Sequence, residues 1–524
     1  MTESVITNPI IPGFAPDPSI VLVDGTYFLV NPSFHIFPGI PVYASTDLAA
    51  WRLIGHAVND PSKISLSRSG TDLISLANGE TLIAAGGLYA PTIRHDNGKF
   101  YVICTNLRRS QEDNGTTTHQ NFYTTCTDIY SNTWTDPIFF DLHGIDPSLF
   151  FDGNRAYIQG SFVVDYSQQP SCTIKQFEID LATGQPLSPQ KDLWTGSAKI
   201  DPEGPHSYKR GAFYYLLIAE GGTFEHHQVS VARSTSIWGP FEPCPDNPIL
   251  TKVDRQGEHV QHTGQADIFV DQQGQWWAVV LGVRKFEPTR FPMGRETFLS
   301  KVHWRDDGWP SIDPVKPTVV VPGTGLGQGT QPGPIAGDAS IYIRDMDPSK
   351  FRILEDGTMR LIAGCSDFCN ADDPVSFVGM RQRKLDGRVA ATLMLDPSSK
   401  ARHEFTAGVA LYKDEHRYAQ LLCDSATCQV RFHFLNKAKG AVESATRDVE
   451  PAECVQFEIR HSASTYEFCF RTVEEQNWIQ VGSVGTSDMT GYDFTGPLLG
   501  VFGARSGDRS HADVEVVFKD FKCF

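Results

Sequence analysis

The chain is long for a single domain and strongly acidic. It has 524 residues and a formal net charge of −17 at pH 7, so we expect two domains. This charge argues against nucleic acid and anionic membranes as partners, and no stretch has the apolar length needed to span a bilayer. The chain is rich in Gly (45), Pro (33) and Phe (33), which favours many short strands joined by turns.

The amino terminus and the cysteines bear on the cellular compartment. The opening stretch, MTESVITNPIIPG, has neither the basic region nor the long apolar region of a secretory signal. We therefore expect a cytoplasmic protein, or a secreted one if a leader precedes this sequence in the cell. The eleven cysteines lack metal-type spacing, so we expect free thiols in a reducing compartment.

Five similar segments follow one another over roughly the first 320 residues. Each contains a short apolar run, a two-residue turn such as Asp-Gly or Asn-Gly, and an aromatic-rich run, which is typical of a β-hairpin. A second hairpin, marked by a tryptophan, follows most of them. The segments are DPSIVLVDGTYFLVN from residue 17, APTIRHDNGKFYVICTN from 90, DPSLFFDGNRAYIQG from 146, EGPHSYKRGAFYYLLIAEGG from 203 and QADIFVDQQGQWWAVVLG from 265.

The repeat predicts the architecture of the first domain. Its period is about 55–75 residues, with about four strands in each unit, and such units arranged around an axis form a β-propeller. We expect a five-bladed β-propeller over residues 1–321; an irregular β-sandwich is the alternative. Since the first strand of each blade is innermost, the residues that open the repeats should meet at the central channel.

A Gly/Pro-rich stretch, PGTGLGQGTQPGP, marks a domain boundary. We place a linker at residues 322–335 and a second domain at 336–524. In this second domain, segments such as FTAGVALYKD and VQFEIRHS alternate apolar and polar residues, which indicates half-buried strands of a β-sandwich. The predicted fold is therefore all-β, a five-bladed β-propeller followed by a β-sandwich.

Three acidic residues open repeats of the predicted propeller. Asp17, in GFAPDPSI, and Asp146, in GIDPSLFF, precede proline, and Glu203 lies in KIDPEGPH. Taken singly, each aspartate is typical of a turn cap; together, the repeat brings all three to one place. Crowded carboxyl groups have pKa values that differ from one another. A pair of carboxyl groups beside a scissile bond is the machinery of most glycoside hydrolases.

These segments, together with MGRETFL, resemble glycoside hydrolase family 43, in particular its β-xylosidase and α-L-arabinofuranosidase branch with a C-terminal β-sandwich. The resemblance spans essentially the whole chain and implies hydrolysis with inversion, releasing one pentose from a non-reducing end. By motif, it places the general base on Asp17, the acid that modulates pKa on Asp146 and the general acid on Glu203. Arg295, in GRET, matches a residue that holds substrate hydroxyls.

The resemblance also implies a sugar pocket with aromatic walls. Phe34 and Phe37, in NPSFHIFPGIP, and Tyr89, in GGLYAPTI, match this wall, although each is equally typical of core packing. The sandwich of this branch packs against the propeller and helps to close the pocket. For the segment that does so, the sequence offers VFGARSGDRS (501–510).

One position departs from the family pattern. Gln265, in TGQAD, stands where a channel histidine is usual and where some members have a bound calcium ion. A glutamine can hydrogen-bond but cannot be protonated. We retain Gln265 as a substrate-pocket residue and expect that no cofactor is required, with Ca²⁺ in the channel as the alternative.

The leading functional prediction is an exo-acting β-D-xylosidase that acts on xylo-oligosaccharides. An α-L-arabinofuranosidase acting on arabino-oligosaccharides, or a bifunctional enzyme, is the alternative. A galactan β-galactosidase and a catalytically inactive sugar-binding propeller are the further readings. Nucleic acid and membrane are not expected as partners, and a homo-oligomer is compatible with the sequence.

Overall fold

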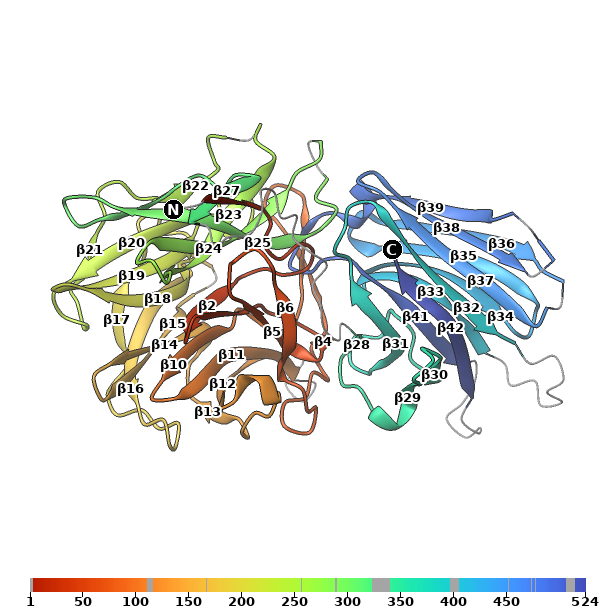
Figure 1. Cartoon of the computed structure of the whole chain (residues 1–524), viewed down its shortest axis with the longest axis horizontal. Helices are drawn as coiled ribbons and strands as arrows, with labels where there is room; N and C mark the ends of the chain where they lie inside the picture. Colours follow the sequence, from red (N-terminus) through yellow and green to blue (C-terminus); the bar gives the residue numbers. More distant parts are fainter. Residues whose placement is uncertain are drawn as a thin grey trace.

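The computed structural model describes the chain except for residues 1–2, 111–115, 166, 256, 288–289, 323–339, 396–404, 451, 473, 476 and 506–513. The described residues form β-strands and short 3-10 helices, arranged in two bodies that lie side by side (Figure 1). The 3-10 helices are η1 (Ile129–Ser131), η2 (Pro348–Lys350), η3 (Lys437–Lys439) and η4 (Thr486–Met489). The prediction of an all-β chain is confirmed.

The first body is a propeller whose five blades each have a four-stranded antiparallel path, as the repeat predicts. Two short strands, β9 (Gly87–Leu88) and β22 (Leu250–Thr251), add to the second and fourth blades. The blades, in order, are β2 (Ser19–Val23), β3 (Thr26–Val30), β5 (Gly39–Ser45) and β6 (Arg52–Val58); β10 (Thr92–Asp96), β11 (Lys99–Ser110), β12 (Thr116–Cys126) and β13 (Ile138–Phe140); β14 (Gly144–Asp152), β15 (Arg155–Val163), β16 (Cys172–Ile179) and β17 (Lys191–Trp194); β18 (Glu203–Arg210), β19 (Phe213–Glu220), β20 (Gln228–Ser234) and β21 (Glu242–Pro243); and β23 (Val260–Val270), β24 (Trp276–Arg284), β25 (Arg295–Trp304) and β26 (Pro310–Ile312).

The two ends of the propeller segment are joined by a separate strand pair. β1 (Glu3–Thr7) runs antiparallel to β27 (Thr318–Pro322). Beside this pair, the Asn8 amide donates to the carbonyl oxygen atoms of Leu299 and Lys316, at 2.9 Å each. The propeller strands thus continue to residue 322, and the remainder of the predicted linker, 323–335, lies outside the described residues.

The second body is a sandwich of two antiparallel sheets. Alternating burial along its strands matches the predicted half-buried pattern; for example, burial alternates residue by residue from Gln429 to Asn436. One sheet contains β36 (Ala441–Asp448), β35 (Gln429–Asn436), β34 (Arg417–Asp424), β33 (Phe405–Asp414), β41 (Leu498–Arg505), β31 (Val375–Arg381), β28 (Ile341–Ile343) and β4 (Ile36–Phe37); the other contains β29 (Phe351–Ile353), β30 (Met359–Ile362), β42 (Glu515–Cys523), β32 (Gly387–Met394), β37 (Cys454–His461), β38 (Thr465–Thr472) and β39 (Ile479–Gly485).

The two bodies share strands, which the sequence did not indicate. β4, from the propeller segment, is the edge strand of a sandwich sheet and pairs with β28 (Figure 1). A three-stranded sheet joins β7 (Asp72–Ser75) and β8 (Thr81–Ala84) to β40 (Tyr492–Asp493). The interface between the bodies is therefore made of backbone hydrogen bonds as well as packed side chains.

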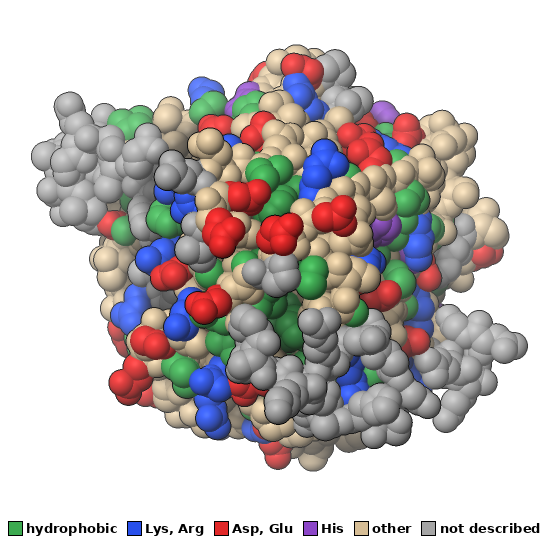
Figure 2. All heavy atoms as spheres, turned by 90° about the vertical axis from the view of Figure 1, so that its right-hand side faces the viewer, with side chains coloured by type: hydrophobic (Ala, Val, Ile, Leu, Met, Phe, Trp, Pro, Cys, Tyr) green, Lys and Arg blue, Asp and Glu red, His purple; other side chains and the backbone are tan. Residues whose placement is uncertain are grey.

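Seen from the sandwich end, acidic and basic side chains lie interspersed among apolar and neutral ones (Figure 2). All eleven cysteines are free thiols in the structure, as the sequence predicts. No helix in the described part of the chain is long and apolar enough to cross a membrane.

One buried carboxylate joins the inner strands of four blades. Asp267, in β23 of the fifth blade, accepts hydrogen bonds from the Ser19 hydroxyl (2.7 Å) and the Ile20 N–H (3.2 Å) of the first blade. It also accepts from Arg94 Nη1 (2.7 Å) of the second blade and from the Tyr208 hydroxyl (2.5 Å) of the fourth. Burial is the largest single influence and opposes ionisation of this group, but the Arg94 guanidinium, His206 and the side-chain hydrogen bonds together outweigh it and lower the pKa of Asp267 to about 2.

The substitution Asp267→Asn tests this junction. It leaves the Arg94 guanidinium without its charged partner, so we expect a loss of about 3–5 kcal/mol in the free energy of unfolding, the usual cost of breaking a buried ion pair. Chemical denaturation at pH 7 measures the loss. Because the folded-state pKa is depressed, the stabilisation should be present above about pH 4, the range of the unfolded carboxyl group, and disappear as the pH falls through about 2.

Ser19→Ala is the control, since it removes a neutral donor to the same carboxylate, together with an acceptor for the Ile93 N–H and Arg94 Nη1, and leaves the charge of Asp267 in place. We expect it to cost about 1 kcal/mol. Equal losses for the two variants would contradict a central role for the charge of Asp267.

Candidate active site

The inner strands of four blades carry a backbone irregularity at the channel. Asp17 (φ 43°), Asp146 (φ 54°), Gly204 (φ 55°) and Gln265 (φ 36°) all adopt left-handed backbone conformations. The pairing register shifts around Asp146, Gly204 and Gln265. Such bulges redirect a side chain and are frequent next to active sites. Four blades therefore share a left-handed residue at this end of the inner strand, and three of them add a shift in pairing register.

The register corrects one expectation from the repeat. In the third blade, the bulge lies between Ile145 and Ser148; in the fourth, it lies between Glu203 and His206. The residue equivalent to Asp146 is therefore Gly204, and Glu203 lies one position earlier. The general-acid candidate enters the channel from a different backbone position than the two aspartates. A glycine at 204 is suited to this place because its backbone is left-handed and the Gln265 side chain packs against it.

The structure brings the two predicted catalytic aspartates and Arg295 together. Arg295, at the start of β25, places Nη1 3.5 Å from Asp17 Oδ1 and Nη2 3.5 Å from Asp17 Oδ2. Its Nη1 also donates to the Thr223 hydroxyl at 3.0 Å. Asp146 Oδ2 accepts from the Gly204 N–H at 3.1 Å, which links the third and fourth blades directly behind the acids. Both aspartates are buried.

The backbone around each acid is held by hydrogen bonds from other strands. The Asn31 amide donates to the Pro16 carbonyl oxygen at 2.5 Å, directly before Asp17. The Ser161 hydroxyl donates to the Pro202 carbonyl oxygen at 2.7 Å, directly before Glu203. These contacts fix the acids to the second strands of their own and neighbouring blades, so the site is built on the rigid part of the fold.

The environments of the three acids differ. Burial raises the pKa of Asp17, and the adjacent Arg295 guanidinium counteracts this rise. Burial, followed by the charge of Asp17, raises the pKa of Asp146 to about 7. Burial, followed by the charges of Asp146, Asp201 and Asp17, raises the pKa of Glu203 well above its usual value. The proton is thus favoured on Glu203, and the negative charge on Asp17, which is nearest to the arginine.

Glu296, the next residue after Arg295, has a structural role. Its carboxylate is fully buried and accepts from Arg284 Nε (2.7 Å), Arg284 Nη2 (2.8 Å) and the Gly13 N–H (2.7 Å). These contacts hold the amino-terminal segment before Asp17 against β25. The sequence places two adjacent charged residues on opposite faces of this strand, one toward the acids and one toward the scaffold.

Aromatic side chains pack around Arg295. The Phe34 ring is stacked with Phe494, with centroids 5.8 Å apart, and contacts Tyr89 at 5.3 Å. The Arg295 guanidinium lies 5.0 Å from the Phe494 ring centroid, and its Nε and Nη2 donate to the Phe494 carbonyl oxygen at 3.3 and 3.2 Å. Phe34 and Tyr89 thus pack beside Arg295 and belong to one hydrophobic cluster, in which Phe34 is 2% exposed.

Phe494 was missed by the sequence analysis, although it lies beside Arg295. It belongs to the second domain, directly after β40, and no local pattern in GYDFTGP marks it as a pocket residue. The segment proposed from sequence, 501–510, is β41 up to Arg505, and its remainder lies outside the described residues. The sandwich therefore reaches the site through the turn before β41.

Phe37 is not part of this cluster. It lies in β4, pairs with Tyr342 of the sandwich, and packs in a hydrophobic cluster with Ile40, Val58 and Leu88. Its side chain is as buried as that of Phe34, so its packing partners and not its burial distinguish the two residues. Because β4 is the edge strand of a sandwich sheet, the second aromatic residue of NPSFHIF is used for packing between the domains.

Gln265 lies in β23, the inner strand of the fifth blade. Its side chain is buried and packs against Gly204, while the neighbouring Gly264 leaves room for the His227 ring. Calcium takes six to eight oxygen ligands, and the described residues contain no group of three or more His, Cys, Asp or Glu side chains placed to hold a metal ion. Burial lowers the pKa of His227 to about 3, so this ring is neutral near pH 7.

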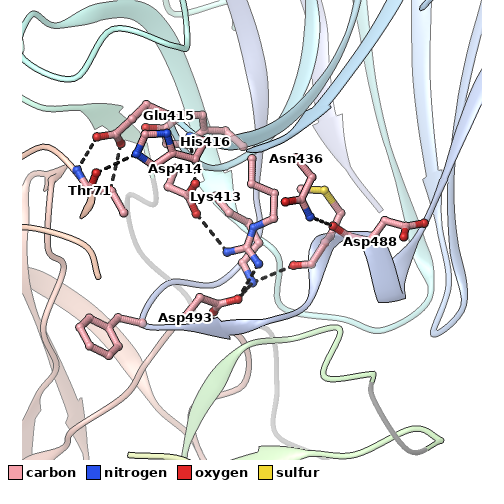
Figure 3. Close-up of polar contacts among 12 residues, drawn as sticks. Thr71, Lys413, Asp414, Glu415, His416, Asn436, Asp488 and Asp493 are labelled. Atoms are coloured by element: carbon pink, nitrogen blue, oxygen red, sulfur yellow. Dashed lines mark hydrogen bonds and ion pairs between the residues drawn. The ribbon is translucent and has the colours of Figure 1, made fainter. Parts of the chain in front are cut away.

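A buried ionic network holds the segment that carries Phe494 (Figure 3). Asp493, one residue earlier, accepts hydrogen bonds from Arg417 Nη1 (2.6 Å) and Lys413 Nζ (3.0 Å). Arg417 Nη2 also donates to Asp414 (3.0 Å), and Lys413 Nζ donates to the Met489 carbonyl oxygen (3.0 Å). These charges, from the YKDEHR turn between β33 and β34, fix β40 and hence the position of Phe494.

The same turn also grips the propeller segment (Figure 3). Glu415 accepts hydrogen bonds from both the N–H and the hydroxyl of Thr71, the latter at 3.0 Å. The imidazole Nε2 of His416 lies 2.7 Å from the Thr71 carbonyl oxygen. Consecutive residues of one sandwich turn thus contact both the propeller loop before β7 and the pocket segment.

Comparison with known proteins identifies the family. The model of glycosyl hydrolases family 43 matches residues 6–310, and that of the β-xylosidase C-terminal concanavalin A-like domain matches residues 342–519. The chain belongs to glycosyl hydrolase family 43. It is a glycoside hydrolase by family, and both parts of the chain match.

Relatives in family 43 span the whole chain. A non-reducing end α-L-arabinofuranosidase of Bacteroides ovatus is 31% identical, covering 100% of this chain and 96% of its own length. A xylosidase/arabinosidase of Butyrivibrio fibrisolvens is 31% identical over 86% of each chain. Among solved structures, a xylan β-1,4-xylosidase of Bacillus halodurans superposes with a TM-score of 0.84 at 27% identity, covering 98% of each chain.

The first prediction for this family 43 site concerns Arg295→Gln. The guanidinium counteracts the rise in the pKa of Asp17. It also offsets part of the rise in the pKa values of Asp146 and Glu203. Its removal should therefore move the acidic limb of the pH profile of kcat/KM to higher pH, since the base ionises later. Arg295→Lys, which keeps the charge, is the control. An unchanged acidic limb in Arg295→Gln would contradict the assignment.

The second prediction concerns Asp493→Asn, which removes the charge that Lys413 and Arg417 share. Phe494 should lose its fixed position beside Arg295, so we expect kcat/KM to fall about 10²-fold, the effect of a misplaced positioning group. Steady-state kinetics on a nitrophenyl glycoside, compared with Phe494→Ala, measures the loss. A loss of stability with an unchanged kcat/KM would make the network purely structural.

Proposed function

We propose that this chain is an inverting, exo-acting glycoside hydrolase that releases a pentose, β-D-xylose first, from non-reducing ends of xylo-oligosaccharides. The observation that carries the proposal is the difference in electrostatic environment between two acids, the buried Asp17 and the half-buried Glu203. Asp17 is paired with Arg295. The pKa of Glu203 is raised by burial and further by the charges of three neighbouring carboxylates, and the opposing effect of Arg295 on Glu203 is smaller. One group is thereby suited to accept a proton and the other to donate one.

The reaction follows from this difference. The Asp17 carboxylate takes a proton from a water molecule as the water oxygen attacks the anomeric carbon. Glu203 gives its proton to the glycosidic oxygen as the bond between that oxygen and the anomeric carbon breaks. Attack from the face opposite the leaving group inverts the configuration. Asp146, whose pKa is raised to about 7, carries a negative charge above that pH, and this charge further raises the pKa of Glu203.

The sandwich supports an exo mode of action. Phe494 stacks with Phe34 and accepts from Arg295 through its carbonyl oxygen, so the second domain supplies one side of the pocket. A pocket closed on one side admits the end of a chain and excludes its middle. Arg295 suits the hydroxyl groups of a terminal sugar, since a guanidinium offers fixed donors that keep their charge.

An α-L-arabinofuranosidase is the second candidate, because a relative that spans the whole chain carries that name. The two pentoses present similar hydroxyl groups to one pocket, and another relative is named for both activities. Hydrolysis of 4-nitrophenyl β-D-xylopyranoside and 4-nitrophenyl α-L-arabinofuranoside by pure protein decides between them. Absence of turnover on both, with xylose binding retained, would leave an inactive sugar-binding propeller.

The roles of the two acids predict different responses to the leaving group. Glu203→Gln should lower kcat on xylobiose about 10²–10⁴-fold, the usual contribution of general acid catalysis. It should lower kcat far less on a dinitrophenyl xyloside, whose leaving group needs no proton. Asp17→Asn should lower kcat on both substrates alike, since the water still needs a base.

Asp201→Asn is the matched control, because Asp201 acts on the pKa of Glu203 through its charge alone. We expect it to retain turnover and to shift the alkaline limb of the pH profile slightly to lower pH. Equal responses of Glu203→Gln to the two leaving groups would overturn the assignment of the acid.

A further inference from the structure

A cavity lies at the second blade, whose strands fall between Asp17 and Asp146 in the sequence. It has a volume of about 440 Å³ and opens beside the hairpin of β11 and β12. Its lining residues are Arg68, Arg108, Arg109, Thr118, His119, Gln120, Asn121, Phe139 and Phe140. All the side chains with a permanent charge in this lining are arginines, although the protein has a net charge of −17.

The topology places this cavity at the catalytic end of the propeller. The inner strand β10 begins at Thr92, which pairs with Ile103 of β11. Beyond Ile103, β11 and β12 continue together through the pair Ser110 and Thr116, past the start of β10. The catalytic acids also lie where inner strands start, so the extended hairpin and the acids share one end.

A buried amide links the cavity to the third blade. Asn121 lines the cavity, and its Nδ2 donates to the carbonyl oxygen atoms of Leu142 (2.7 Å) and Gly144 (3.3 Å). Gly144 begins β14, two residues before Asp146. The wall of the cavity is therefore continuous with the strand that carries a catalytic acid.

The three arginines of the cavity differ in whether their guanidinium group is paired with an acidic side chain. Arg109 pairs with Asp72, with Nη2 and Oδ2 2.6 Å apart. Among the ion pairs of the described residues, Arg68 and Arg108 have no acidic partner, and Nε of Arg108 is buried without a hydrogen bond. Burial, followed by the nearby His143, lowers the pKa of His119 to about 4, so this ring adds no charge near neutral pH. Two guanidinium groups thus remain available to an anion.

The cavity also offers an apolar surface. Phe139 is 44% exposed, in contrast to Phe140, which is 8% exposed and packs in the core. An exposed ring beside unpaired guanidinium groups suits a ligand that has both a sugar ring and a carboxylate, since arginine binds a carboxylate through two parallel hydrogen bonds. A neutral oligosaccharide would leave the arginines unused.

We propose that this cavity binds the carboxylate of a uronic acid residue in the leaving-group part of an oligosaccharide. Arg68 and Arg108 hold the carboxylate, and Phe139 contacts the sugar ring. The preferred substrates are then acidic oligosaccharides with a pentose at the non-reducing end. The assignment to the leaving-group side rests on the proposed function, whereas the binding of the acidic sugar does not.

Calorimetry with two ligands tests the proposal. Xylotriose and a xylotriose that carries a glucuronic acid substituent are titrated into Glu203→Gln protein, which does not cleave them during the measurement. We expect the acidic ligand to bind about tenfold more tightly, an effect typical of charge-assisted hydrogen bonds. Adding Arg68→Gln and Arg108→Gln should abolish this preference. Equal affinities for the two ligands, or a preference that survives both substitutions, would overturn the proposal.

Two further variants keep the result interpretable. Arg68→Lys with Arg108→Lys retains both charges and should keep part of the preference, which excludes misfolding as the cause of its loss. Arg52→Gln removes an exposed arginine of β6 and should leave the preference unchanged. The titration does not depend on turnover: inactivity of the wild-type protein on nitrophenyl pentosides would refute the proposed function and leave the binding result to decide on the cavity.

Discussion

The carboxylate of Asp267 is the constraint on which the propeller and its site depend. Its bonds reach Ser19, two residues after Asp17, and Arg94 of the neighbouring blade. The same Arg94 contacts His206, three residues after Glu203, at 3.0 Å. A buried charge is costly unless it is paired and hydrogen-bonded. The inner strands must therefore converge to satisfy this group, and that convergence also brings the catalytic acids together.

The sandwich completes what the propeller begins. Arg295 spans the two bodies, since one side of its guanidinium faces Asp17 and the other donates to Phe494. The ionic network around Asp493 holds Phe494 in place, and strand sharing at β4 and β40 prevents the bodies from separating freely. The Phe494 carbonyl oxygen of the sandwich thus helps to position the Arg295 guanidinium, which in turn pairs with Asp17 of the propeller.

The sequence predicts what is local or repeated. Turn chemistry and aromatic runs mark the hairpins, and the repetition of Asp17 and Asp146 before proline marks the inner ends of two blades. The bulge that puts Gly204 at the equivalent place is a matter of strand register, which depends on pairing partners. Contacts between distant segments also place Phe37 between the two domains and Phe494, which the sequence analysis missed, beside Arg295.

Charge acts at two ranges in this molecule. The net charge of −17 repels an acidic oligosaccharide at a distance, but this repulsion is screened beyond about 8 Å at physiological ionic strength. Inside that range, only neighbouring groups count. Arg295 faces carboxylates and is largely neutralised by them, whereas Arg68 and Arg108 line a cavity without acidic side chains. A carboxylate on a substrate therefore meets the charges of Arg68 and Arg108 in that cavity, so recognition there depends on local geometry rather than on the overall field of the protein.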